Sequence, residues 1–249
     1  MKEQKIISEY RLYPTSIFEL TLPGYKTFNY KFEEFIYKEY KKQPKGLDAS
    51  NYGGWHSNYF ELDHPIISEF FHKIDPIFDT LMKKYLNWNV YDYFMGIKGI
   101  WAIINKKGDY NVDHRHGDAL LSFAYYVKVP KEKPNVKKTK NQVDRGTGNI
   151  YFKDPRVASI ARRPPMVRPW ENHPNFNPER AENATHGNQS ENFEPIEGKL
   201  IIFPGWLEHG VHPHYSDEDR IVISGNVNLY PKKSNSPDGS LYQPHYTTH

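Results

Sequence analysis

The stretch Ala119-Leu-Leu-Ser-Phe-Ala-Tyr-Tyr-Val-Lys-Val129 decides the fold, because its aromatic and β-branched residues predict a buried strand that stops at Pro130. Directly before it stand His114, His116 and Asp118, three residues that can bind a metal ion. Side chains two positions apart on a strand point to the same face. We therefore expect a mainly β domain that carries a polar site at the start of this strand.

Three further strand-like runs follow later in the chain. The second contains His209, and the third begins at Arg220 and alternates in character, so that Arg220 and Ser224 share one face. The acidic tract 216–219 is interpreted as the hairpin turn that joins these two runs. The three runs are residues 198–203, 206–211 and 220–229.

The metal-binding residues match a facial Fe(II) site, in which two histidines and one carboxylate leave three positions of an octahedron open. His116, Asp118 and His209 supply that set, and the carboxylate favours them because a hard anion balances the charge of the iron. In this arrangement His114 lies beside a cosubstrate or behind the ligating side chains. His114 with His116 has the same two-residue spacing and is the alternative pair of ligands.

A 2-oxo acid is the cosubstrate that such a site would accept, because it can chelate two of the open iron positions. Arg220 offers a planar fork for the far carboxylate of that molecule, and Ser224 can add a hydroxyl from the same face. An ion pair with Asp217 or Asp219 is the structural alternative for Arg220. The position of Arg220 shortly after His209 favours the cosubstrate role.

Four separated motifs resemble the 2OG-Fe(II) oxygenase family of bacteria and tailed phages, which is similar to the prolyl hydroxylases within the 2-oxoglutarate/Fe(II)-dependent dioxygenases. Relatives have a proline after the second histidine of the motif that contains His114 and His116, where this chain has Gly117. This departure leaves both pairs of ligands open. The motifs occur in the family's order at residues 108–111, 114–127, 148–156 and 200–211, with fainter likenesses at residues 13–15 and 53–57.

The resemblance implies a double-stranded β-helix (jelly-roll) core with flanking helices, Fe(II) as cofactor, and 2-oxoglutarate and dioxygen as cosubstrates. It implies hydroxylation of a C–H bond in a protein side chain, such as a prolyl residue, or in a small molecule. A cupin-like metal enzyme that does not use 2-oxoglutarate and a non-catalytic jelly-roll binding module are the alternatives on the same fold. Nucleic acid is the least favoured partner, and only the basic loops argue for it.

Length and composition agree with one enzyme domain. The chain has 249 residues, of which 37% are hydrophobic and 15% aromatic, and this is enough for a large core. The net charge of +3 is too small to indicate a nucleic-acid-binding protein. The absence of cysteine excludes disulfides and thiolate metal sites. Because the chain has neither an apolar signal core nor a run of about 18 apolar residues, we expect no membrane partner and a location in the cytoplasm of a bacterium or a phage-infected cell.

We expect a single domain, 1–249, with N-terminal strands and supporting helices in 1–95, the jelly-roll core in 96–230 and a tail in 231–249. A long insertion, 131–195, interrupts the core. It is basic at its start and then rich in proline and asparagine, and it is interpreted as a lid over the substrate or as a solvated connection.

Two amphipathic helices are expected in the N-terminal part. Residues 7–40 are interpreted as a strand pair followed by a short helix, and a longer helix opens at Pro65, continues to Tyr85 and is kinked by Pro76. Seven histidines have no partner in the sequence and are expected to be solvated. They are His56, His64, His72, His173, His186, His245 and His249.

Overall fold

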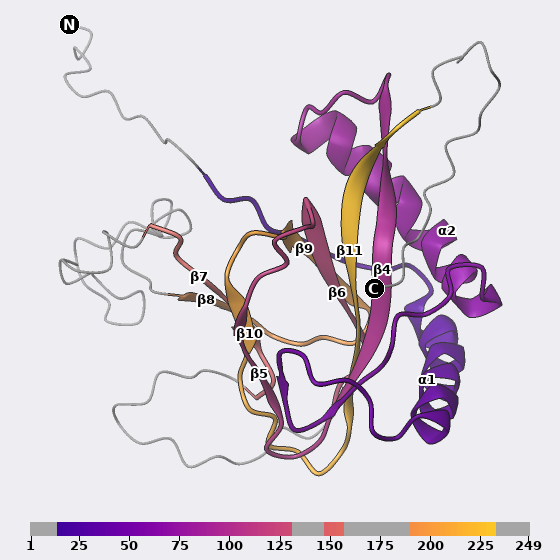
Figure 1. Cartoon of the computed structure of the whole chain (residues 1–249), viewed down its shortest axis with the longest axis vertical. Helices are drawn as coiled ribbons and strands as arrows, with labels where there is room; N and C mark the ends of the chain where they lie inside the picture. Colours follow the sequence, from indigo (N-terminus) through magenta and orange to yellow (C-terminus); the bar gives the residue numbers. More distant parts are fainter. Residues whose placement is uncertain (1–13, 131–146, 157–189, 233–249) are drawn as a thin grey trace, which may run out of the picture.

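The computed structural model describes residues 14–130, 147–156 and 190–232, which form two antiparallel sheets that face each other (Figure 1). Most of the insertion that is interpreted as a lid, and the tail beyond residue 232, lie outside the described residues. The six-stranded sheet has the order β1 (Phe18–Thr21), β9 (Lys199–Pro204), β6 (Leu121–Lys128), β11 (Arg220–Pro231), β4 (Tyr93–Asn105) and β3 (Trp55–His56). The five-stranded sheet has the order β2 (Asn51–Tyr52), β5 (Tyr110–His114), β10 (His209–Val211), β7 (Ile150–Lys153) and β8 (Ser190–Phe193).

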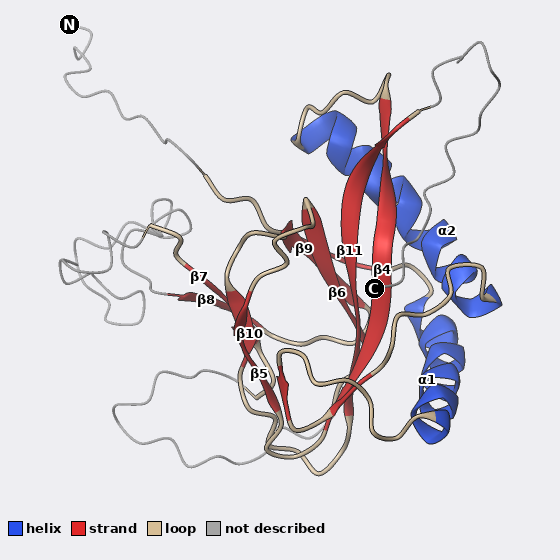
Figure 2. Cartoon of the chain, viewed as in Figure 1, coloured by secondary structure: helices blue, strands red, loops and turns tan. Residues whose placement is uncertain are grey.

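The chain crosses from one sheet to the other almost strand by strand. Strands β4, β6, β9 and β11 belong to the six-stranded sheet, whereas β5, β7, β8 and β10, which lie between them in sequence, belong to the five-stranded sheet. Figure 2 shows the two sets of strands opposite each other. This alternation is that of a jelly roll, so the expected mainly β fold with a jelly-roll core and flanking helices is confirmed.

Two helices, α1 (Tyr25–Lys42) and α2 (Pro65–Thr80), cover the outer face of the six-stranded sheet (Figure 1). Phe70 of α2 is fully buried, and its ring lies 6.1 Å from that of Phe123 and 5.1 Å from that of Tyr125 on β6. Burial of one such side chain contributes about 1.5–3 kcal/mol, so this aromatic layer holds the helices on the sheet. No helix in the described segments is long and apolar enough to cross a membrane.

The longer helix begins at Pro65, as predicted, because a proline in the first turn loses no helical hydrogen bond. It accommodates Pro76 in its interior, and the chain continues as a π-helix over Leu81–Tyr85. The hydroxyl of Thr80 donates to the carbonyl of Pro76 at 2.8 Å in the last turn. The first helix, α1, is longer than the short helix expected from the sequence.

Strand β6 is buried on both faces, which explains why most of its residues are apolar. Phe123 and Tyr125 belong to the core that includes the helices, whereas Ala124 and Tyr126 belong to a second core that faces the five-stranded sheet. This second core also contains Phe152 of β7. The strand that decides the fold is therefore the layer shared by two cores.

The prediction that residues 216–219 form a hairpin turn is wrong. Strand β10 pairs with β5 and β7, whereas β11 pairs with β4 and β6, so the acidic tract belongs to a crossover between the two sheets. The hydroxyl of Tyr37 in α1 donates to Asp219 at 2.7 Å, and this fixes the crossover on the six-stranded side. Alternation within each run could not reveal which sheet each run would join.

Candidate metal centre

Three histidines, two from neighbouring strands of the five-stranded sheet and one from the segment after β5, meet at one place. His114 ends β5, His116 lies two residues beyond it, and His209 begins β10 directly opposite His114. One ring nitrogen of each histidine lies within 4.8 Å of the other two, and the ring centroids of His114 and His209 are 4.2 Å apart. The structure therefore brings the first motif and the distant histidine together.

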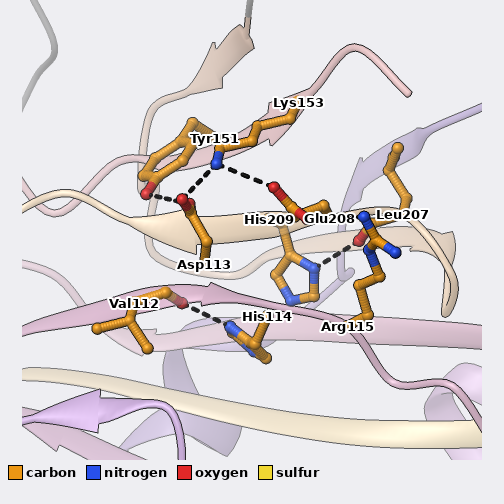
Figure 3. Close-up of polar contacts among 9 residues, drawn as sticks. All are labelled: Val112, Asp113, His114, Arg115, Tyr151, Lys153, Leu207, Glu208 and His209. Atoms are coloured by element: carbon orange, nitrogen blue, oxygen red, sulfur yellow. Dashed lines mark hydrogen bonds and ion pairs between the residues drawn. The ribbon is translucent and has the colours of Figure 1, made fainter. Parts of the chain in front are cut away.

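The backbone decides which ring nitrogen two of these histidines present. Nδ1 of His114 lies 2.8 Å from the carbonyl of Val112, and Nδ1 of His209 lies 2.8 Å from the carbonyl of Leu207 (Figure 3). A carbonyl oxygen can only accept, so both Nδ1 atoms carry the hydrogen and both Nε2 atoms present a lone pair. Bonds of this kind orient the histidines of metal sites.

Burial keeps the three imidazoles in the form that binds a metal. It lowers the pKa of His209 to about 3 and that of His116 to about 4, and the neighbouring histidines act in the same direction. Burial also lowers the pKa of His114. Because a metal ion binds neutral imidazole, the cluster needs to release no proton at neutral pH. Three imidazole nitrogens suit Fe(II), among other first-row metals.

Asp118 does not join the cluster. The backbone N–H of Ala119 donates to the carbonyl of His116 at 3.0 Å, so the two residues between them form the tip of a turn. The carboxylate of Asp118 is exposed and pairs with Lys98. Side chains two apart share a face only while the strand continues, and here it ends at His114. The pair that the structure brings to His209 is the alternative one.

Gly205 allows the turn after β9 to approach the chain around His116. The N–H of His116 donates to the carbonyl of Gly205 at 2.8 Å, and the N–H of Gly205 donates to that of Leu120 at 3.1 Å. A Cβ atom at this glycine would lie 2.3 Å from the carbonyl oxygen of Ala119, so no other residue fits without a shift. This close approach fixes the backbone of His116. The ring of His116 itself forms no hydrogen bond with a described residue.

An ion-pair network ties the ligand-bearing strands together (Figure 3). Lys153 on β7 contacts Asp113 and also Glu208, the latter at 2.9 Å. Arg115 contacts Glu208 at 2.7 Å, and the hydroxyl of Tyr151 donates to Asp113 at 2.7 Å. Along the chain Asp113, Arg115 and Glu208 are immediate neighbours of the clustered histidines. The network therefore links β5, β7 and β10 around the cluster.

A cavity of about 980 Å³ reaches the histidine cluster. One part of its lining consists of Arg220, Val222 and Ser224 of β11, as the alternation in the sequence predicts, and the first two of these residues are buried. Its exposed part, in which most but not all of the lining residues are exposed, is lined by residues 47–50 and by His56, Asn58, Tyr59 and Glu61. A volume of this size can hold a substrate in addition to a small cosubstrate.

Arg220 is buried without an anionic partner. It is 2% exposed, and no carboxylate of the described residues forms an ion pair with it. Its guanidinium donates to Asn105 Oδ1 at 2.9 Å and lies 5.2 Å from the ring centroid of Tyr126. Asp217 pairs with Lys107 instead, so the predicted structural alternative for Arg220 is not used there. Burial lowers the pKa of this arginine, and the adjacent tyrosine acts against that effect.

Three buried polar atoms around this guanidinium lack a hydrogen-bond partner among the described residues. They are Nε of Arg220, Nδ2 of Asn105 and the hydroxyl of Tyr126. Leaving a buried polar group unpaired costs about 1–3 kcal/mol, so a protein retains such a set where a ligand completes it. A donor set next to one positive charge fits a carboxylate. Asn105 and Tyr126 were not predicted from the sequence, because the sequence around each of them is typical of the interior of a strand.

His56 is a further residue of the cavity, and the prediction that it is solvated is wrong. It was expected to be solvated, but it is 7% exposed and stacks on Trp101 at 5.6 Å. Its neighbours in sequence, Trp55 and Ser57, are also buried, because β3 pairs with β4. The signal that could have found it is the likeness to the family at residues 53–57. His64 and His72 are exposed, as predicted.

The sequence matches a family model described as "Putative 2OG-Fe(II) oxygenase" over residues 99–226. This range contains all three clustered histidines and Arg220. No curated protein sequence matches the chain.

Solved structures with the same fold include enzymes of several kinds. A prolyl-4-hydroxylase of Pseudomonas putida is 9% identical with a TM-score of 0.52, and the alignment covers 86% of this chain and 92% of that one. HygX of Streptomyces hygroscopicus, solved with nickel, 2-oxoglutarate and hygromycin B, is 11% identical with a TM-score of 0.52, covering 86% and 82%. The α-ketoglutarate-dependent carbocyclase SnoK of nogalamycin biosynthesis is 12% identical with a TM-score of 0.54, covering 87% and 79%. These likenesses establish the fold.

Proposed function

The chain belongs to the 2OG-Fe(II) oxygenase family and is an Fe(II)- and 2-oxoglutarate-dependent oxygenase, and we propose that His114, His116 and His209 hold its iron. When bound, iron and 2-oxoglutarate activate dioxygen for the oxidation of a C–H bond. The observation that carries this assignment is the convergence of three neutral imidazoles at the edge of a cavity.

The geometry of the first motif supports this ligand set over one that includes Asp118. His114 and His209 face each other across paired strands, and each donates Nδ1–H to a backbone carbonyl, which leaves Nε2 for the metal. Asp118 would have to leave its ion pair with Lys98 and reverse the turn that carries it. The site therefore has three neutral ligands, and 2-oxoglutarate brings the anionic oxygen that iron favours.

Arg220 binds the far carboxylate of 2-oxoglutarate. Its guanidinium is the buried positive charge that lines the cavity, and the unpaired donors of Asn105 and Tyr126 lie beside it. Ser224 lines the cavity from the same strand and can add its hydroxyl to the cosubstrate. The apolar side chains of Phe203 and Val222 in the same lining exclude water and so strengthen the pairing of charges.

The substrate offers a C–H bond for hydroxylation at the exposed part of the cavity. A protein side chain is one candidate, because a prolyl-4-hydroxylase of Pseudomonas putida has a similar structure. A small molecule is the other, because HygX was solved with hygromycin B. The cavity of about 980 Å³ is open to either.

Turnover of 2-oxoglutarate tests this function. We expect the protein to release succinate and CO2 only when Fe(II), 2-oxoglutarate and dioxygen are all supplied, and His209→Ala to release neither. Asp63→Asn is the control, because this exposed carboxylate does not line the cavity. Succinate formation by His209→Ala at the rate of the unchanged protein would contradict the proposal.

A further inference from the structure

The exposed part of the cavity carries negative charge that no described cation balances. Asp48 and Glu61 are both exposed and line the cavity, and neither side chain has a hydrogen-bond or ion-pair partner in the segments that the structure describes. Arg115 lines the same cavity, but its guanidinium pairs with Glu208 at 2.7 Å. The local potential of this part therefore favours a cation.

A buried histidine supplies a hydrogen-bond acceptor to the same part of the cavity. Nδ1 of His56 lies 2.7 Å from the carbonyl of Ser57 and must carry the hydrogen, so Nε2 has a free lone pair. Burial lowers the pKa of this histidine, so the ring is neutral at neutral pH. His56 is 7% exposed, it lines the cavity, and no described residue donates to its Nε2. A ligand can supply the hydrogen-bond donor that this buried acceptor lacks.

The ring of Trp101 connects this acceptor with the metal centre and also contacts Tyr59. The ring of Trp101 lies 5.6 Å from that of His56, 5.6 Å from that of Tyr59 and 5.7 Å from that of His116. Aromatic faces attract ammonium and guanidinium groups, most strongly where water is excluded. A group held against these rings would lie next to the iron ligands.

A second unpaired acceptor is found in the same lining. Asn111 is 2% exposed, and its Nδ2 donates to Ser50 Oγ at 3.1 Å, while its Oδ1 has no partner among the described residues. The exposed part of the cavity therefore offers acceptors and carboxylates, whereas the part around Arg220 offers donors.

We propose that Asp48, Glu61 and His56 bind a primary substrate that carries an ammonium or guanidinium group, held against Tyr59 and Trp101. The proposal rests on the proposed function and adds to it the chemical class of the substrate. The opposite polarities of the two parts keep the anionic cosubstrate and the cationic substrate in separate places. The cation belongs either to a basic side chain of a protein or to a free amine, since both present the same group.

Binding of matched probes to the metal-free protein tests this inference. Nα-acetyl-lysine methylamide represents the protein side chain, cadaverine represents the free amine, and the Nε-acetylated lysine derivative lacks the charge. Ligand-observed NMR gives the dissociation constants. We expect at least one cationic probe to bind about fivefold to tenfold more tightly than the acetylated one. The probe that binds more tightly identifies the source of the cation.

Charge-removing variants assign the preference to this surface. The double variant Asp48→Asn/Glu61→Gln is expected to bind charged and acetylated probes equally, whereas the control Asp63→Asn, two residues from Glu61, keeps the preference. Both substitutions of the double variant are at exposed positions, so the fold is retained. His56→Phe keeps a ring against Trp101, removes the acceptor and should weaken binding of the cationic probe several-fold.

Several results would overturn the inference. They are equal binding of the charged and acetylated probes, a preference that survives in the double variant, and no binding of a cationic probe up to roughly 10 mM. The visible band of the iron complex with 2-oxoglutarate separates this failure from that of the proposed function. If the band forms and the preference is absent, the substrate class alone is wrong. If the preference is present and no band forms, the oxygenase assignment fails instead.

Discussion

The two sheets of the molecule are held together by different forces and carry different parts of the site. The six-stranded sheet is packed under two helices by buried rings such as Phe70, and it supplies Arg220 from β11. The five-stranded sheet consists of short strands that an ion-pair network links through Lys153, and it supplies His114 and His209. The arginine that we propose binds the cosubstrate thus stands on the layer held by apolar packing, whereas the proposed metal ligands stand on or next to the layer that polar contacts link.

This difference implies that stability and metal affinity can be changed separately. Substitutions under the six-stranded sheet should lower the free energy of unfolding and leave the metal centre intact. Substitutions in the network around Lys153 should instead weaken metal binding and leave the free energy of unfolding nearly unchanged.

Removal of a core ring should have the largest effect on stability. Phe70→Ala deletes a fully buried side chain that contacts Phe28, Phe123 and Tyr125, so we expect the free energy of unfolding to fall by about 3–5 kcal/mol. Denaturant unfolding measures this change. At a temperature where the variant is folded, its affinity for Fe(II) should equal that of the unchanged protein. A large loss of iron affinity in the folded variant would show that the two sheets are not independent.

Removal of the buried positive charge should impair the use of 2-oxoglutarate. Arg220→Leu leaves the donors of Asn105 and Tyr126 without the charge between them. We expect KM for 2-oxoglutarate to rise by about 100-fold, which corresponds to the loss of a buried charge pair. Steady-state succinate formation measures it, and Arg156→Leu, which removes an exposed arginine that does not line the cavity, is the matched control. An unchanged KM would remove Arg220 from the cosubstrate site.

Loss of the network should weaken metal binding more than folding. Lys153→Met breaks the contacts with Asp113 and Glu208, which neighbour the ligating histidines. We expect about a tenfold loss in affinity for Fe(II), because groups that orient metal ligands have effects of that size. The free energy of unfolding should change by less than about 1 kcal/mol, since these side chains are partly solvated. If the two proteins bind Fe(II) with equal affinity, the network does not position the metal-binding histidines.

The pH dependence of that small stability difference should follow the carboxylates. The hydrogen bond from Lys153 and its charge hold the pKa of Glu208 below its usual range. A carboxylate of this kind stabilises the folded protein above its ordinary pKa, and the contribution is lost as the pH falls through the lowered value. The difference in unfolding free energy between the unchanged protein and Lys153→Met should therefore be present at pH 7 and disappear on acidification as Glu208 becomes protonated. A difference that grows on acidification would reverse the assigned sign.

The sequence predicts the strands that are buried on one or two faces better than it predicts the turns. The apolar run of β6 and the alternation that puts Arg220 and Ser224 on the cavity were both apparent, because periodicity of two survives within a strand. The place of Asp118 was not, since a turn at Gly117 ends the alternation that would have aligned it with His116. The local sequence pattern does not show at which residue a strand ends.

Partners that come from distant segments were equally hidden. His56 is buried only because β3 pairs with β4. Asn105 is a candidate for binding the cosubstrate only because Arg220 extends to it from the neighbouring strand. Neither contact can be predicted from the spacing of residues along the chain. The assignment of β10 and β11 to different sheets is hidden for the same reason.

The ligand set is tested most directly by anaerobic titration of Fe(II) in the presence of 2-oxoglutarate, with the visible charge-transfer band of the complex as the signal. The unchanged protein and Asp118→Ala are expected to develop the band with the same midpoint, because Asp118 is engaged with Lys98 and lies outside the cluster. His114→Ala is expected to lose it. A band that survives in His114→Ala and disappears in Asp118→Ala would contradict the three-histidine centre.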